Sequence, residues 1–220
     1  MSVLIFIDQS EGHVKKSSLE ALTYGADVAK QLGTTAEAIV LGTVSEDLAA
    51  LGKYGVSKIH QVSNAALNNV DAQVYASVIS ESATACGASV IVFSHNQTGK
   101  AVAARVAAKL KAGLVAGACA LPDTSNGFSV KKTVFSGKAY AHVNILSAVK
   151  VISLNPNSYK TVATEGTAAV EALAVTVNEP KVKITAVNKI TGEVPLTEAD
   201  IVVSGGRGLK GPEHWGILLD

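Results

Sequence analysis

The residues with the clearest chemical potential lie in the stretch IVVSGGRGLKGPEHWGILLD, which runs from 201 to 220. Gly206, Gly208 and Gly211 follow a run of β-branched residues and match the G-x-G-x-x-G pattern of dinucleotide-binding loops. A dinucleotide site also needs a complete β-α-β unit and an acidic residue about 20 positions further on, and the nine residues after Gly211 have room for neither. Pro212 also fits the first position of a helix, so the third glycine would precede that helix. An ordinary glycine-rich turn therefore stays open as an interpretation.

Arg207 stands between two of these glycines, Gly206 and Gly208. Glycines allow a backbone to turn tightly and to approach a ligand closely. The guanidinium of arginine is planar and permanently charged, so it can stack on an aromatic ring or hold negative charge. This combination suits a flavin or a nucleotide better than it suits a protein core.

A second candidate loop comprises Asn96, Gln97, Thr98 and Gly99, between an apolar run and a helical pattern. Its amides and hydroxyls could hold a phosphate at a helix N-terminus, and open α/β sheets bind ligands at that edge. Asp8, which ends the first apolar run, belongs to the same edge, either in a pocket or, as we favour, in an exposed loop. N-capping by Asn96 or Thr98 is the alternative for the second loop, and the spacing alone favours it.

No metal or hydrolase site is predicted from local spacing. The five histidines form no i, i+4 pair and no HExxH motif, and the chain holds no GxSxG sequence. Cys86 and Cys119 belong to no CxxC pair, so we expect two buried free thiols, as is usual in a reducing cytosol.

Composition indicates a folded protein without a bias toward charged partners. Apolar residues make up 48% of the 220 residues, charged residues 17%, and the net charge is +1. This balance gives no reason to expect nucleic acid or an anionic membrane as a partner. No run of eighteen apolar residues and no leader sequence is evident, so we expect neither a membrane span nor a targeting segment.

The first 120 residues alternate between strand and helix patterns. The expected strands are VLIFID (3–8), TAEAIVLG (35–42), KIHQV (58–62), ASVIVFSH (88–95) and LVAGACAL (114–121). Between them we expect a helix closed by Gly33, a short helix at 47–53, a helix capped by Asp71, and a helical face through Val102 and Val106. Such alternation predicts an α/β fold with a mainly parallel sheet covered by helices on both faces.

After Pro122 the pattern changes to strands with little helix between them. FSVKKTVFSGKAYAHVNI (128–145) predicts two strands around a turn at Ser136 and Gly137. The further apolar runs at 149–155, 169–177 and 182–190 predict antiparallel strands, or edge strands added to the first sheet. The polar stretch 191–200 is typical of a linker, and IVVS (201–204) predicts a new strand after it.

Four segments of this sequence together resemble the alpha subunit of electron transfer flavoprotein. They are VLIFIDQSEGHVKKSSLEALTYGADVAKQLG (3–33), SVIVFSHNQTGKAVAARVAAKL (89–110), FSVKKTVFSGKAYAHV (128–143) and, most specific of all, IVVSGGRGLKGPEHWGIL (201–218). The second segment carries a Gly-Lys pair followed by an arginine, here Gly99-Lys100 and Arg105, as is typical of that family. The resemblance covers essentially the whole chain.

The resemblance implies a three-layer α/β/α domain of the adenine nucleotide alpha hydrolase-like type at residues 1–190, with antiparallel strands after residue 122. It further implies a linker at 191–197 and the start of an FAD-binding domain at 198–220. Arg207 would lie against the isoalloxazine of FAD, where its charge favours the reduced, anionic flavin, and Gly206 and Gly208 would let the backbone come close. About 100 further residues of the family pattern carry the other FAD contacts, so we expect these 220 residues to retain FAD weakly or not at all.

The resemblance also implies how such a protein works. It would be an electron carrier rather than an enzyme, and it would pair with a beta subunit. Its electrons would come from acyl-CoA dehydrogenases or related flavoenzymes in fatty acid β-oxidation and pass to a membrane quinone oxidoreductase, with the carrier itself in the bacterial cytoplasm.

Two other functions stay open. The first is a stand-alone adenine nucleotide-binding module of the universal-stress type, which would use the loop from Asn96 to Gly99 and the edge at Asp8. IVVSGGRGLKG speaks against it, because such a module does not need that segment. The second, weaker alternative is a fragment of a dinucleotide-dependent oxidoreductase.

Overall fold

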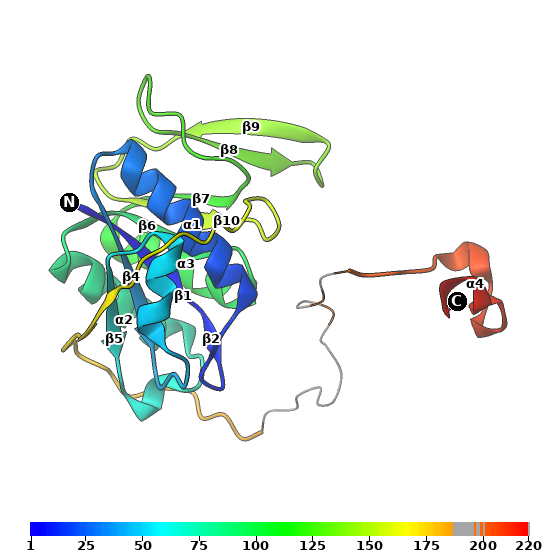
Figure 1. Ribbon diagram of the computed structural model, residues 1–220, viewed down its shortest axis with the longest axis horizontal. Helices are drawn as coiled ribbons and strands as arrows, with labels where there is room; N and C mark the ends of the chain where they lie inside the picture. The colour runs from blue at the N-terminus through cyan, green and yellow to red at the C-terminus, as the bar shows by residue number, and fades with distance from the viewer. Residues whose placement is uncertain (187–195, 197–198, 200, 220) are drawn as a thin grey trace. The chain divides into compact units, whose positions relative to one another are not determined.

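The computed structural model describes residues 1–186, 196, 199 and 201–219 (Figure 1). The chain divides into two compact units, Met1–Lys183 and Ile184–Asp220, and each is described by itself. The linker predicted at 191–197 lies outside the described residues, except for Leu196. The domain boundary predicted between 190 and 198 therefore also falls outside them.

A nine-stranded sheet forms the centre of the first unit, in the order β11-β5-β4-β1-β6-β10-β7-β8-β9. The strands are β1 (Ser2–Ile7), β4 (Thr35–Leu41), β5 (Lys58–Val62), β6 (Ala88–Ser94), β7 (Gly113–Ala118), β8 (Ser129–Val134), β9 (Ala139–Asn144), β10 (Lys150–Leu154) and β11 (Ala169–Ala172). From β11 to β7 all neighbours are parallel, whereas β8 and β9 are antiparallel. A two-stranded hairpin, β2 (Gln9–Ser10) with β3 (His13–Val14), follows β1.

Helices cover both faces of this sheet, which confirms the predicted three-layer α/β/α class. They are α1 (Lys16–Gln31), α2 (Ala72–Ala85) and α3 (Gln97–Leu110), with two 3₁₀ helices, η1 (Leu48–Tyr54) and η2 (Ala65–Leu67). Helix α1 packs on β1, β4 and β6, while α2 and α3 pack together on the opposite face (Figure 1). Among the described residues, none of the helices has both the length and the apolar character needed to cross a bilayer.

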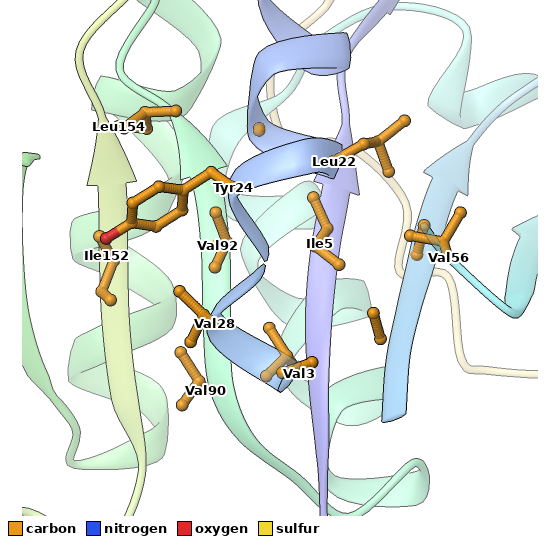
Figure 2. Close-up of a cluster of buried hydrophobic side chains, with 14 of the residues drawn as sticks. Val3, Ile5, Leu22, Tyr24, Val28, Val56, Val90, Val92, Ile152 and Leu154 are labelled. Atoms are coloured by element: carbon orange, nitrogen blue, oxygen red, sulfur yellow. The ribbon is translucent and has the colours of Figure 1, made fainter. Parts of the chain in front are cut away.

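Alternation along each strand divides the core into two layers. Val3 and Ile5 of β1 point to the α1 side, where they share a core cluster with Leu22 and Val28 of the helix, while the Tyr24 ring points toward Ile152 of β10 (Figure 2). Leu4 and Phe6, which alternate with them in β1, point to the other side, into a cluster with α2 and α3. Strands buried on both faces need the continuous apolar runs seen in the sequence.

The helix ends follow the predicted signals. The Asp71 carboxylate accepts hydrogen bonds from the backbone N–H groups of Gln73 and Val74, which confirms it as the N-cap of α2. Gly33 follows α1 with a φ of 63°, a left-handed conformation that glycine adopts without strain. The short helix predicted at 47–53 is η1, capped by Asp47.

One strand lies where the sequence did not predict it. The hairpin β8–β9 and the edge position of β11 are confirmed, but β10 is a parallel strand between β6 and β7 in the middle of the sheet. The interpretation of 149–155 as antiparallel or edge was therefore wrong. Parallel neighbours usually require a helical crossover. Here β8 and β9 form the connection from β7 to β10, and no local pattern reveals that.

The second unit contains only short helical turns among its described residues. They are η3 (Arg207–Leu209), η4 (Pro212–His214) and α4 (Gly216–Leu219), and Pro212 takes the first position of η4 as predicted. The strand predicted at 201–204 is not formed. A strand requires a partner for its backbone hydrogen bonds, and the described residues offer these four none.

Candidate functional site

The loop around Arg207 is exposed and open. Gly206 is the N-cap residue of η3 with extended backbone, and Arg207 begins the helix. A methyl group added at Gly206 or Gly208 would have no described neighbour within 4 Å, whereas one at Gly205 would collide with Leu209. Among the described residues, the backbone on both sides of Arg207 is thus unobstructed, and the role of these glycines at a flavin stays a prediction.

Asn96 serves as the N-cap of α3, as one of the two sequence interpretations predicts. Its Oδ1 accepts a hydrogen bond from the Gly99 N–H at 2.9 Å. Gly99 lies so close to the end of β6 that a methyl group there would overlap the carbonyl oxygen of Ser94. The glycine is therefore required for packing α3 against the sheet, and the side chain of Asn96 is already engaged.

Asp8 is buried rather than part of an exposed loop, which corrects the favoured interpretation of that edge. Its Oδ2 accepts hydrogen bonds from Asn96 Nδ2 at 2.8 Å and from Lys15 Nζ at 2.9 Å. The carboxylate side chain is only 3% exposed. The sheet edge thus brings Asp8 and Asn96 together as predicted, but they bind each other and stabilise the loops.

His95 and Ser153 extend this edge at the ends of β6 and β10. The Nδ1 atom of His95 lies 2.8 Å from Ser153 Oγ. Burial, assisted by the positive charges of Lys100 and Lys132, lowers the pKa of His95 from its usual value. The sequence could not predict this pair, because it depends on the unpredicted central position of β10.

Both cysteines are free, but they are half-buried rather than buried as predicted. Cys86 lies beside His60 and Glu37, and the three side chains form a cluster that spacing rules did not predict. These residues are 23 and 26 positions apart, and only the sheet register brings them together. Burial, with the negative charge of Glu37, raises the pKa of the Cys86 thiol, and Lys58 opposes this effect.

Comparison with protein families identifies one match, which covers most of the chain. Residues 3–179 match the model described as "Electron transfer flavoprotein domain". The matched range spans all of the sheet in the first unit except Ser2, and it ends before the loop at Arg207.

Curated relatives extend the similarity through the second unit. The chain is 31% identical over 219 residues to the electron transfer flavoprotein subunit alpha of Syntrophomonas wolfei, covering 98% of this chain and 67% of the relative. It is 28% identical to Protein FixB of Clostridium saccharobutylicum, covering 98% of this chain and 67% of that protein. It is also 28% identical to a probable mitochondrial subunit alpha of Cryptococcus neoformans, covering 100% of this chain and 64% of that one.

The chain spans about two thirds of the length of these relatives. The match to the family model and the similarity to alpha subunits show that the chain belongs to the electron transfer flavoprotein family.

Proposed function

We propose that this chain acts in electron transfer as the alpha-subunit component of an electron transfer flavoprotein, a carrier rather than an enzyme. The observation that carries the proposal is the similarity to subunit alpha over 98% of the chain, which includes the loop around Arg207. A stand-alone nucleotide-binding module receives less support, because Asn96 and Asp8 are engaged with each other.

FAD is the cofactor that we propose for the complete heterodimer. The open backbone at Gly206 and Gly208 and the exposed guanidinium of Arg207 fit the approach of a planar, electron-rich ring. When bound, the flavin supplies the electron-transfer chemistry, and the protein tunes it through nearby charge. Arg207 would favour the more negative, reduced form, while the glycines leave room for the ring.

The first unit would act as a scaffold and as the contact surface for a beta subunit. We propose acyl-CoA dehydrogenase-type flavoenzymes of fatty acid β-oxidation as electron donors and a membrane quinone oxidoreductase as the acceptor. We also propose a bacterial cytoplasmic location. The free thiols of Cys86 and Cys119 support it, because disulfides are rare in reducing compartments.

Co-expression with an electron transfer flavoprotein beta subunit tests this proposal. We expect the two chains to elute together as a 1:1 complex in size-exclusion chromatography, and the chain alone to lose FAD on desalting. Absence of any complex with the beta subunit would refute the alpha-subunit role. Stoichiometric FAD on the chain alone would refute the proposal that further flavin contacts come from outside these 220 residues.

A further inference from the structure

A three-residue cluster lies in the amino-terminal half of β4 and the middle of β5, away from Arg207 in the sequence and away from the Asp8 edge. Glu37 belongs to β4 and His60 to β5, and both lie on the side of the sheet that α2 covers. Cys86 is the C-cap residue of α2. The end of that helix therefore delivers a thiol to the two strand side chains.

The ligand atoms of these side chains converge on one point. His60 Nε2 lies 2.7 Å from Glu37 Oε2 and 3.5 Å from Cys86 Sγ. The three ligand atoms all lie within 4.8 Å of one another. His60 is buried, whereas Glu37 and Cys86 are partly exposed. The protein interior therefore fixes the position of the imidazole, while solvent can reach the carboxylate and the thiol.

A single hydrogen on the ring nitrogen of His60 cannot fully serve both of its close contacts. The same nitrogen, His60 Nε2, faces both a carboxylate oxygen and a sulfur atom. A ring nitrogen carries at most one hydrogen, and thiols are weak donors and acceptors. A single cation in place of that hydrogen would interact with all three atoms at once.

We propose that Glu37, His60 and Cys86 bind one transition-metal cation of the zinc type. Thiolate, imidazole and carboxylate are the three ligand classes that zinc uses in proteins. Zinc bonds of about 2.0–2.3 Å in a tetrahedron place neighbouring ligand atoms roughly 3.3–3.8 Å apart. The sulfur–nitrogen distance of 3.5 Å already matches, and the partly exposed carboxylate needs only a small outward movement.

The charges around the cluster suit a divalent ion. A thiolate on Cys86 and the carboxylate of Glu37 would together neutralise the two positive charges of the metal. Lys58 lies nearby, but its ammonium group pairs with Glu171 at 3.0 Å on the neighbouring strand β11. Three protein ligands leave the fourth position of a tetrahedron for water or another small ligand.

Cobalt titration of the metal-stripped chain tests the site with an optical signal. We expect one Co²⁺ per chain, with a thiolate-to-cobalt charge-transfer band in the near ultraviolet, and we expect Zn²⁺ to abolish that band by displacement. Cys86→Ser should remove the charge-transfer band and weaken Zn²⁺ binding at least about 100-fold. This follows because losing even a residue that only hydrogen-bonds to a metal ligand typically lowers metal affinity about 10–100-fold.

Cys119→Ser is the matched control, since Cys119 is the other half-buried free thiol and lies outside the cluster. It should keep both the band and the affinity. Glu37→Gln provides a second, milder variant on a partly exposed side chain and should weaken Zn²⁺ binding at least about tenfold. Circular dichroism of each variant checks the fold. A wild-type chain without the charge-transfer band, or a folded Cys86→Ser variant with unchanged Zn²⁺ affinity, would overturn the proposal.

Discussion

The Tyr159 hydroxyl donates a hydrogen bond to Asp27 Oδ2 at 2.6 Å, and this contact ties the segment after β10 to helix α1. The Tyr159 ring also meets the Tyr24 ring edge-on, with 5.3 Å between the ring centroids. Further along, the Thr164 N–H donates to the Lys53 carbonyl of η1. These contacts with α1 and η1 hold the connection from the central strand β10 to the edge strand β11 in place on the first unit.

Tyr159→Phe should destabilise the first unit by about 1–2 kcal/mol. The substitution keeps the ring contact with Tyr24 but removes a hydrogen bond to a carboxylate, and such bonds contribute about 1.5–3 kcal/mol before partial exposure is considered. Urea unfolding monitored by circular dichroism measures the change. Tyr140→Phe is the control, because Tyr140 is 60% exposed on β9, and its loss of a hydroxyl should leave stability unchanged. Equal stability of the two variants would show that the Tyr159–Asp27 hydrogen bond does not stabilise the first unit.

Gly99→Ala should cost more than about 2 kcal/mol of stability. The added methyl group would overlap the Ser94 carbonyl oxygen, which is backbone and cannot rotate away, so α3 must shift from the sheet. Ala104→Gly changes the same methyl group at an exposed position of α3 and should cost only about 1 kcal/mol. Thermal unfolding compares the two variants. A Gly99→Ala variant as stable as Ala104→Gly would show that α3 does not need the close approach.

Local signals predicted the elements whose causes are local. Asp71 and Asn96 are N-caps because a short acceptor side chain precedes each helix, and that information lies within four residues. The β8–β9 turn follows from Gly137, which has a φ of 84° as tight turns require. The alternation of the first 120 residues likewise fixed the layers, because amphipathic periodicity reports which face each element buries.

Features that depend on long-range register were not predictable in the same way. The position of β10 follows from its pairing with β6 and β7. These two strands are consecutive along the chain, so the sequence gives no sign that a later strand lies between them. The contact of His60 with Glu37 and Cys86 depends on the same kind of information, because strand register and a helix end bring them together. The apolar run at 201–204 shows the reverse case, in which strand-forming residues find no partner among the described residues.

His95 should make the first unit sensitive to mild acid. Its pKa is lowered in the folded state by burial and by Lys100 and Lys132, so the unfolded chain binds the proton more readily. Stability should therefore fall as pH drops below about 6.5 and level off below the folded-state pKa. The loss should stay below about 1.4 kcal/mol per pH unit, the value for a fully linked group, because His95 is partly exposed and solvent screens its interactions with the two lysines.

Urea unfolding at pH 7.5 and 5.5 measures this effect in the His95→Gln variant, which should lose less stability on acidification than the wild type. His142→Gln, a change at an exposed histidine of β9, controls for the loss of an imidazole elsewhere. A decline in His95→Gln as steep as that of the wild-type chain would assign the acid sensitivity to other groups.

Arg207→Gln should lower the midpoint potential of the flavin in a heterodimer that retains FAD. Removing a fixed positive charge beside the ring withdraws stabilisation from the reduced form, which is the more negative one. A loss of about 1.4 kcal/mol corresponds to about 30 mV for a two-electron couple. Spectroelectrochemical titration measures the shift, and FAD content measured in parallel separates altered tuning from loss of the cofactor.

Lys210→Gln is the matched control for that prediction. It removes the same unit of charge from the same exposed turn, three residues after Arg207, at a position that follows η3 rather than beginning it. A general effect of net charge would shift both variants equally, whereas a guanidinium held close to the ring should make the shift of Arg207→Gln clearly larger, because Coulomb energy falls with distance and with solvent screening. Equal potentials in the two variants would therefore place Arg207 away from the flavin.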